Sequence, residues 1–252
     1  MSNGAPDPDP HEPAVVSEER ARAFLAAGEL ELLGRIPWAS NATLLAKVAH
    51  EGLEGLAVYK PARGERPLWD FPAGTLYRRE VAAYLVSERL GWRLVPPTLA
   101  RDGPLGVGSV QLYVDADPEV TAFELLADEH PAMVRIAAFD VVTNNADRKA
   151  GHCLAGPDGR VWAIDHGLCF HVQAKLRTVL WDLAGTRLEG EILGDLERLA
   201  AEAASGGPLA ADLGELLDGD EVAALARRAR ALVRIGRLPA PRGDRAYPWP
   251  LV

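Results

Sequence analysis

Short apolar runs separated by glycine or polar residues dominate the first part of the chain and predict a small antiparallel sheet. A short helix, which Ser17 is expected to cap, precedes these runs and ends near Gly28. Two further runs with strand character come later in the chain. The five predicted strands are Leu30 to Trp38, Thr43 to Ala49, Leu53 to Tyr59, Val95 to Ala100 and Ser109 to Val114.

One long helix is predicted between these strands, from Thr75 to Leu90. Its apolar residues recur at helical spacing, Thr75 can cap its start and Gly91 can end it. The preceding stretch, Pro61 to Gly74, is rich in proline and glycine and is therefore predicted to be a loop. The apolar positions of the helix are Leu76, Val81, Tyr84, Leu85 and Leu90.

Beyond Asp115 the pattern changes to helical segments that are interrupted by two short apolar pieces. The expected helices are Pro118 to Leu126, Pro131 to Thr143 and several after Leu188, and the apolar pieces are Cys153 to Ala155 and Val161 to Ile164. The order of elements, a sheet with one helix followed by a mainly helical half, predicts an α+β fold with two lobes.

The composition and the charge exclude several classes of protein. A net charge of −9 and a pI near 5.2 argue against a nucleic-acid partner, because a polyanion would be repelled. The two cysteines, Cys153 and Cys169, are too few for a disulfide scaffold and lack the CxxC spacing of zinc or redox sites. No apolar run approaches the roughly 20 residues of a membrane span, and the acidic, proline-rich start lacks the basic and apolar regions of a signal peptide. We therefore expect a cytoplasmic protein with reduced thiols.

Two aspartates stand where apolar runs end in the second half of the chain. Asp147 follows a predicted helix in NNADRK, and Asp165 ends a predicted strand in IDHG. A short hairpin between the two motifs would place both carboxylates at neighbouring loop ends. Phosphoryl transfer needs such a pair, because one carboxylate orients the attacking hydroxyl and the other holds the metal that neutralises charge between phosphates.

A lysine and a glutamate in the sheet-rich half fit the same chemistry. Lys60 in AVYKP ends a predicted strand, from which its ammonium group can reach ATP phosphates while its stem is buried. Glu80 on the predicted long helix is the natural carboxylate to orient it. A strand lysine, a helix glutamate about twenty residues later and two aspartates in the helical half follow the order of groups in protein kinases.

The motifs YKP, RREVAAYLV, NNADRK and IDHG together resemble the phosphatidylinositol 3-/4-kinase-like superfamily, which includes lipid kinases and HipA-type serine/threonine kinases. GERPLWDFP and KLRTVLWDLAG are similar to an uncharacterised actinobacterial branch of that group. The resemblance covers about residues 30–240 and implies a two-lobed protein-kinase-like fold. We expect an N-lobe at 17–114 that holds the ATP phosphates and a C-lobe at 115–240 with the catalytic loop and metal site. The Asp-Pro repeats of residues 1–16 predict a disordered acidic tail, and residues 241–252 are expected to form a C-terminal tail.

The resemblance implies that the chain binds ATP with Mg²⁺ or Mn²⁺. Lys60 would then contact the α- and β-phosphates, and Glu80 would pair with it. Asp147 would orient or deprotonate the acceptor hydroxyl, and Asp165 would ligate the metal. A hinge would bind the adenine edge through its backbone, and a turn of small residues would cover the phosphates. The hinge is Gln111, Leu112, Tyr113, Val114 and Asp115, and the turn is Ser40, Asn41, Ala42 and Thr43.

One position departs from the pattern of the superfamily. Five residues after the catalytic aspartate such kinases carry an asparagine that binds the second metal, whereas this chain has His152. A neutral imidazole can also ligate a divalent metal, although it is a softer ligand than an amide oxygen. His152 is therefore a candidate metal ligand beside Asp165, and the substitution keeps a pseudokinase among the hypotheses.

Three functions are consistent with these residues. The first is an ATP- and divalent-metal-dependent phosphotransferase whose acceptor is a protein hydroxyl, a small molecule or, least favoured, an inositol lipid. The second is a nucleotide-binding pseudokinase with a regulatory role. The third is a metal-dependent phosphohydrolase, with Mn²⁺ or Zn²⁺ held by a cluster of histidines and aspartates. That cluster consists of Asp147, His152, Asp165, His166 and His171.

Two basic residues, Lys175 and Arg177, follow the Asp165 motif where an activation loop would lie. In an acidic protein such residues are candidates for holding an anionic acceptor, and a helix face exposed to water is the alternative. The sequence favours neither interpretation over the other.

Overall fold

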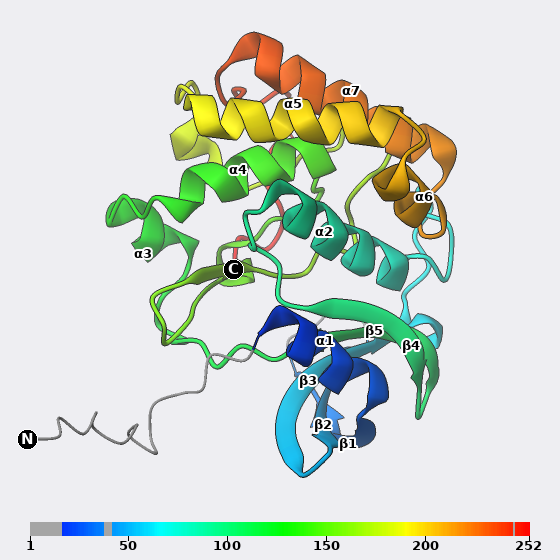
Figure 1. Ribbon diagram of the computed structural model, residues 1–252. Helices are drawn as coiled ribbons and strands as arrows, with labels where there is room; N and C mark the ends of the chain where they lie inside the picture. Colours follow the sequence, from blue (N-terminus) through cyan, green and yellow to red (C-terminus); the bar gives the residue numbers. More distant parts are fainter. Residues whose placement is uncertain (1–16, 38–41, 244) are drawn as a thin grey trace, which may run out of the picture.

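Five strands form the antiparallel sheet that the apolar runs predict. They are β1 (Glu29–Arg35), β2 (Leu44–His50), β3 (Leu53–Pro61), β4 (Thr98–Gly103) and β5 (Gly106–Leu112). Their order in space is β1-β2-β3-β5-β4 (Figure 1). Strand β4 begins later than predicted, because Pro96 and Pro97 have no N–H to donate to a neighbouring strand.

The residues described by the computed structural model are 17–37, 42–243 and 245–252. The predicted tail at 1–16 lies outside them, as do Ser40 and Asn41 of the turn predicted to cover the phosphates. The other two residues of that turn, Ala42 and Thr43, are described. The Ala42 N–H donates to a carbonyl of the loop after β3 at 3.1 Å, so it is not available to a phosphate.

The central strand β3 carries Lys60 near its end. A two-residue turn at Glu51 and Gly52, with φ of 50° and 79°, joins β2 to β3, as is typical of the tight turns that match the twist of a hairpin. On its other side β3 pairs with β5, where Lys60 lies opposite Ser109. The strands approach so closely that a Cβ at Gly108 would lie 2.4 Å from the Lys60 carbonyl oxygen. Lys60 therefore belongs to the middle of the sheet and not to a solvated edge.

The predicted long helix is confirmed as α2 (Leu76–Leu90), which lies between the sheet and the helical half (Figure 1). Most of its residues are buried, because it is covered from both sides. Gly91 ends it in the left-handed conformation with φ of 73°, as the sequence predicts. The prediction that the Thr75 side chain caps the helix is wrong, because its hydroxyl donates to a carbonyl of the preceding loop. The Glu65 carboxylate accepts the N–H of Tyr77 in the first turn at 2.9 Å instead.

The second half of the described chain contains five α-helices and a two-stranded hairpin. These elements are α3 (Ala122–Ala127), α4 (Ala132–Thr143), β6 (Cys153–Ala155), β7 (Val161–Ala163), α5 (Gly190–Ala204), α6 (Pro208–Gly214) and α7 (Gly219–Ile235). Helices α5 and α7 lie side by side over α4 and enclose an apolar core (Figure 1). Helix α3 begins later than the predicted Pro118, because Thr121 caps it in a reciprocal pair of hydrogen bonds with Glu124.

A buried ion pair ties α2 to α7. Arg79 Nη2 is 2.7 Å from Glu221 Oε1, and Arg79 Nη1 donates to the Cys169 carbonyl at 2.7 Å. The guanidinium also lies over the Phe71 ring, 4.9 Å from its centroid. Because separating a buried pair leaves an uncompensated charge, this contact fixes α2 against the helical half.

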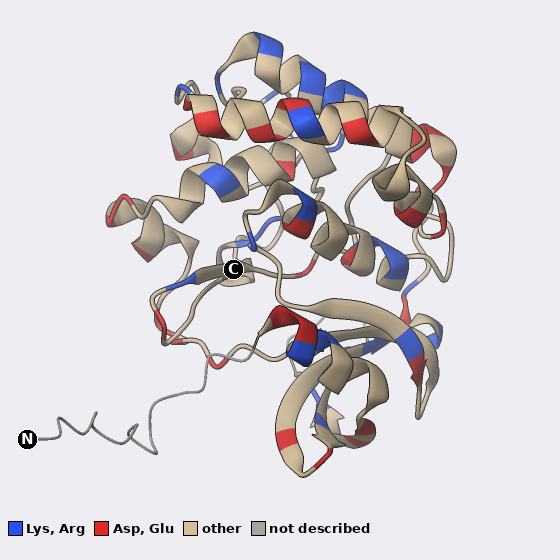
Figure 2. Cartoon of the chain, in the orientation of Figure 1, with Lys and Arg blue, Asp and Glu red and all other residues tan. Residues whose placement is uncertain are grey.

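Charged side chains are distributed over the helices of the second half, with acidic and basic residues interspersed (Figure 2). None of the helices in the described part of the chain combines the length and the apolar character needed to cross a membrane. Cys153 and Cys169 are free and buried, as expected for packing residues.

A hydrogen bond between two carboxyl groups joins α1 (Glu18–Ala27), which Ser17 caps as predicted, to α2. The Glu18 carboxylate accepts from Glu88 and from the Tyr84 hydroxyl. Burial, and then the bond to Glu18, raises the pKa of Glu88 from an ordinary value of 4.5 to about 8. The folded protein therefore keeps a proton on Glu88 that the unfolded chain releases at lower pH.

Because only the folded state holds this proton between about pH 5 and pH 8, the contribution of Glu88 to stability should fall as the pH rises through that window. The buried neutral rings of His152 and His166 act in the opposite direction below about pH 6.5, so the Glu88 contribution is read as a difference between variant and wild type. Glu88→Gln should remove this contribution and leave that of the histidines, since an amide donates the same hydrogen bond without titrating. Thermal unfolding midpoints at the two ends of the window measure the difference. Glu19→Gln, an exposed position on α1, is the matched control and should behave like the wild type. An equal pH dependence in Glu88→Gln and wild type would contradict the shared proton.

Candidate active site

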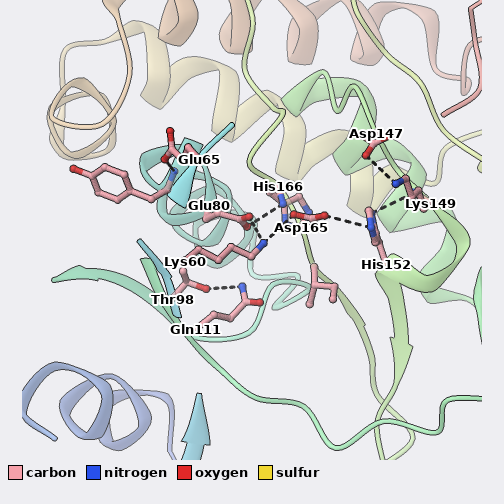
Figure 3. Close-up of polar contacts among 12 residues, drawn as sticks. Lys60, Glu65, Glu80, Thr98, Gln111, Asp147, Lys149, His152, Asp165 and His166 are labelled. Carbon is pink, nitrogen blue, oxygen red and sulfur yellow. Dashed lines mark hydrogen bonds and ion pairs between the residues drawn. The ribbon is translucent and has the colours of Figure 1, made fainter. Parts of the chain in front are cut away.

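Lys60 lies between the carboxylates of Glu80, from α2, and Asp165, from the loop after β7 (Figure 3). Its Nζ is 2.9 Å from Asp165 Oδ1 and also donates to Glu80 Oε1. Burial alone lowers the pKa of Lys60, but the two carboxylates outweigh burial and hold the pKa well above its usual value. Lys60 is therefore a fixed cation where the sheet meets the helical half.

Asp165 is ionised at neutral pH. Burial raises the pKa of its carboxyl, whereas Lys60 lowers it far below the usual range and prevails. The next N–H, of His166, donates to the second oxygen of Glu80 at 2.9 Å. The backbone of Asp165 has φ of 60°, a conformation that is uncommon outside glycine and clusters at functional sites. The contacts of Lys60 and Glu80 thus hold a charged aspartate in a strained backbone position.

Asp147 stands at the other end of this row of polar side chains (Figure 3). Its N–H donates to Asn145 Oδ1 at 2.9 Å, and its carboxylate is 3.5 Å from Lys149 Nζ. Burial raises the pKa of Asp147 to about 6, against the opposing effect of Lys149. The carboxylate is mostly ionised at neutral pH but more basic than an ordinary aspartate, which suits a group that accepts a proton from a hydroxyl.

A buried ion pair that the sequence analysis missed anchors the loop of Asp147. Arg148, 0% exposed, donates to Asp140 on α4 through Nε and Nη2, each 2.9 Å from a carboxylate oxygen. Asn145 donates to the same carboxylate at 3.0 Å. A signal was present in the sequence: Asp140 is an acid inside the otherwise apolar part of a predicted helix, where an unpaired charge is unfavourable.

The same guanidinium connects the two aspartate motifs. Arg148 Nη1 donates to the Ile164 carbonyl at 2.7 Å, and Nη2 lies 2.8 Å from His166 Nε2. Because arginine can only donate, His166 Nε2 is the acceptor and the ring proton is on Nδ1. Burial lowers the pKa of His166 well below its usual value, which keeps the ring neutral as this bond requires. Ile164 and His166 flank Asp165, so Arg148 fixes the distance between the two aspartates.

His152, at the position of the usual second-metal asparagine, lies beside Asp165. Its Nε2 is 3.3 Å from Asp165 Oδ2, and its Nδ1 accepts the Lys149 N–H at 3.4 Å. Burial lowers the pKa of His152 to about 4, so the ring is neutral. With Nδ1 accepting, the ring proton is on Nε2 and faces Asp165. Metal ligation by Nε2 requires the other tautomer, and the metal role of His152 stays a prediction.

The described residues contain no group of three or more His, Cys, Asp or Glu side chains that could hold a metal ion by itself. Mg²⁺ commonly binds through one or two carboxylates together with the phosphates of a substrate. Asp165, ionised and adjacent to Lys60, is a hard oxygen donor of that kind. The residues present therefore fit a metal that arrives with a nucleotide, with Asp165 as its protein ligand.

Some backbone N–H groups of the predicted hinge at the end of β5 already donate to other parts of the protein. The N–H groups of Leu112 and Tyr113 donate to carbonyls of neighbouring segments at 2.9 and 3.1 Å. The buried Gln111 amide donates to a threonine hydroxyl of β4 at 2.8 Å. The N–H groups of Leu112 and Tyr113 are therefore not available to an adenine edge, and the predicted backbone contact narrows to the N–H groups of Val114 and Asp115.

Asn144 holds the segment that follows Asp165, a role that the sequence analysis did not assign. It ends α4 with φ of 57°, and its amide donates to the carbonyls of His171 and Gln173 at 2.8 and 2.7 Å. Its oxygen accepts the Lys175 N–H at 2.9 Å. These partners lie 27 to 31 positions away, so no local pattern could have shown them.

Comparison with known sequences identifies the family. No family model matches the chain. Protein Rv2133c of Mycobacterium tuberculosis is 46% identical over 273 residues, which cover 94% of this chain and 97% of that protein. This chain belongs to the family of Rv2133c. A shorter likeness, 34% identity over 122 residues, relates 41% of the chain to 22% of phosphatidylinositol 4-kinase gamma 4 of Oryza sativa subsp. japonica.

Comparison with solved structures shows which known folds this chain resembles. The Golgi casein kinase with Mn/ADP bound has a TM-score of 0.55 and 13% identity, covering 86% of this chain and 74% of that one. The structure of hydra Fam20 with sugar has a TM-score of 0.53 and 15% identity, covering 86% and 87%. The Helicobacter pylori proinflammatory kinase CtkA has a TM-score of 0.50 and 10% identity, covering 85% and 94%. The likeness shows the fold alone, and it confirms the predicted α+β, kinase-like fold.

Proposed function

We propose that this protein is an ATP- and divalent-metal-dependent phosphotransferase of the phosphatidylinositol 3-/4-kinase-like group. The observation that carries the proposal is the convergence of Lys60, Glu80 and Asp165 from a strand, a helix and a loop, with Asp147 on the adjacent loop. Protein kinases use a lysine–glutamate pair next to an ionised aspartate for the phosphates and the metal of ATP. The Golgi casein kinase, which has Mn and ADP bound on a similar fold, supports the same ligands here.

In the proposed reaction Lys60 contacts the ATP phosphates and Asp165 holds the divalent cation. The Asp147 carboxylate accepts the proton of the acceptor hydroxyl while the hydroxyl oxygen forms a bond to the γ-phosphorus. The bond from the γ-phosphorus to the bridging oxygen breaks, and ADP leaves with that electron pair. The cation, when bound, neutralises the charge that spreads over the phosphate oxygens.

A nucleotide-binding pseudokinase is the second candidate, because the Nε2 proton of His152 faces Asp165 where active kinases carry an asparagine. Saturable ATP binding without phosphate transfer in Mg²⁺ or Mn²⁺ would favour it. The phosphohydrolase is not proposed further. Its metal cluster requires His171, whose ring packs against Phe71 with centroids 5.3 Å apart, and His166, which is bound to Arg148.

Thermal unfolding with nucleotide and metal tests the proposed site. ATP with Mn²⁺ or Mg²⁺ should raise the wild-type midpoint, since a ligand at 100 times its Kd stabilises the native state by about 2.7 kcal/mol. Asp165→Ala should lose the metal-dependent part of this rise. Asp212→Ala, at an exposed position on α6, is the matched control and should respond like the wild type. A rise of equal size in Asp165→Ala, or none in the wild type, would refute the nucleotide site.

A further inference from the structure

The two basic residues that follow the Asp165 motif differ in their surroundings. Lys175 Nζ is 2.7 Å from Asp70 Oδ2 and lies 5.0 Å from the centroid of the Trp69 ring, so its charge is neutralised within the chain. The Arg177 guanidinium lowers the pKa of Asp147, and no hydrogen bond or ion pair joins it to another of the described residues. Arg177 is therefore the cation that remains available to a ligand.

Backbone contacts hold Arg177 beside the loop of Asp147. Its N–H donates to the Asn145 carbonyl at 2.9 Å, and its carbonyl accepts the Arg148 N–H at 3.0 Å. These two bonds lie on either side of Asp147, whose carboxylate is 3.5 Å from Lys149 Nζ. Two basic residues, Arg177 and Lys149, thus lie beside Asp147, the proposed proton acceptor, although the net charge of the chain is −9. An acceptor with carboxylates next to its hydroxyl complements this arrangement.

Two exposed tryptophans lie near the segment that contains Lys175 and Arg177. Trp69, 91% exposed, contacts the Lys175 side chain, and Trp249, 87% exposed, belongs to the segment 246–251. Thr178 and Ala150 donate their N–H groups to the two ends of that segment at 3.1 and 2.8 Å, which places it against the loops around Asp147. Small-molecule sites bury about 70–90% of their ligand in a concave pocket, whereas exposed aromatic residues and arginine are typical of protein interfaces. The surroundings of Asp147 therefore fit an extended polypeptide.

We infer that the acceptor is an acidic polypeptide, in which aspartate or glutamate flanks the serine or threonine that receives the phosphate. The inference rests on the proposed function. Arg177 pairs with a flanking carboxylate, while Lys149 stays beside Asp147, whose carboxylate faces the hydroxyl. The hydroxyl oxygen takes the γ-phosphoryl group, its proton moves to Asp147 and ADP leaves, as in the proposed reaction.

Three synthetic peptide mixtures test the inference. Each peptide has one serine or threonine in an alanine–glycine background, and the flanking positions are glutamate, alanine or lysine. With ATP and Mn²⁺, kcat/KM for phosphate transfer should be about tenfold higher for the glutamate mixture than for the alanine mixture, as expected for one or two charge-assisted hydrogen bonds. The ratio should shrink as KCl is added, because salt screens exposed charges. Glycerol 3-phosphate serves as a small anionic acceptor in a separate reaction.

Two substitutions separate the role of Arg177 from the charge of the whole protein. Arg177→Gln should reduce the glutamate-over-alanine ratio to about twofold, mainly through a higher KM for the peptide, and Arg177→Lys should keep part of it. Arg234→Gln removes the same charge from an exposed position on α7 and should keep the full ratio. The backbone bonds of Arg177 do not involve its side chain, and thermal unfolding verifies that each variant folds.

The possible outcomes distinguish this inference from the proposed function. Equal rates on the three mixtures, a preference for lysine, transfer to glycerol 3-phosphate alone or an unchanged ratio in Arg177→Gln would overturn the acidic polypeptide. A nucleotide-dependent rise in midpoint without transfer to any mixture also overturns it but leaves the nucleotide site standing. The absence of both the rise and ATP turnover removes the proposed function itself.

Discussion

Replacing Asp147 with Asn is expected to slow phosphoryl transfer by about 10²–10⁴-fold, while ATP and metal still raise the unfolding midpoint. The amide has the size of the carboxylate but cannot take the proton of the acceptor hydroxyl. Lys60 and Asp165, which hold the nucleotide in the proposed reaction, are bonded to each other and do not depend on Asp147 for their positions. Initial rates of ADP formation at saturating ATP, in variant and wild type, measure the loss.

The pH dependence of the rate gives a second readout for Asp147. Because burial raises its pKa to about 6, the wild-type rate should fall about tenfold per pH unit below that value and level off above it. The residual rate of Asp147→Asn should lack this step, since asparagine does not titrate. Asp212→Asn, outside the site, should keep both the rate and the step. A variant rate within twofold of wild type, or the same step in Asp147→Asn, would assign proton acceptance to another group.

The second large effect is expected on stability. Arg148→Met should lower the free energy of unfolding by about 3–5 kcal/mol, because Asp140 is left fully buried without a countercharge. The Ile164 carbonyl loses its donor in the same variant. Urea unfolding followed by circular dichroism gives the free energy for variant and wild type.

Companion variants show whether the loss comes from the buried pair. Arg227→Met, at an exposed position on α7, should change the free energy of unfolding by no more than about 0.5 kcal/mol. Asp140→Leu combined with Arg148→Met should recover part of the loss, because the unpaired charge is gone. Arg148→Lys, which keeps the charge, extends the test if the Met variant does not fold. A loss in Arg148→Met no larger than in Arg227→Met would disprove the anchoring role.

Much of the fold could be predicted because its elements are specified by local patterns. Helix α2 follows from apolar residues at helical spacing and from Gly91, whose left-handed conformation ends it. The predictions were wrong where the start of an element depends on which side chain reaches a backbone N–H. Glu65, from the loop, bonds the first turn of α2 in place of Thr75, and Thr121 starts α3 later than its proline suggests.

The candidate site could be predicted only as a set of residue types in a certain order. That order pointed to Lys60, Glu80, Asp147 and Asp165, and the structure brings Lys60 into contact with Glu80 and Asp165. Their catalytic roles stay predictions. The adenine hinge was harder to predict, because whether a backbone N–H is free depends on the strand or loop that lies beside it.

The sequence by itself determined the kinds of chemistry present: a strand lysine, a helix glutamate, two aspartates at loop ends and an acidic overall charge. Only the tertiary structure decided which charges are neutralised. Lys175 meets Asp70 across 105 positions of the chain, and Lys60 meets Asp165 across the same separation. The strength of an ion pair depends on distance in space and on burial, and neither follows from position along the chain. For this reason Lys175 and Arg177, two residues apart in the sequence, have different charge environments in the folded protein.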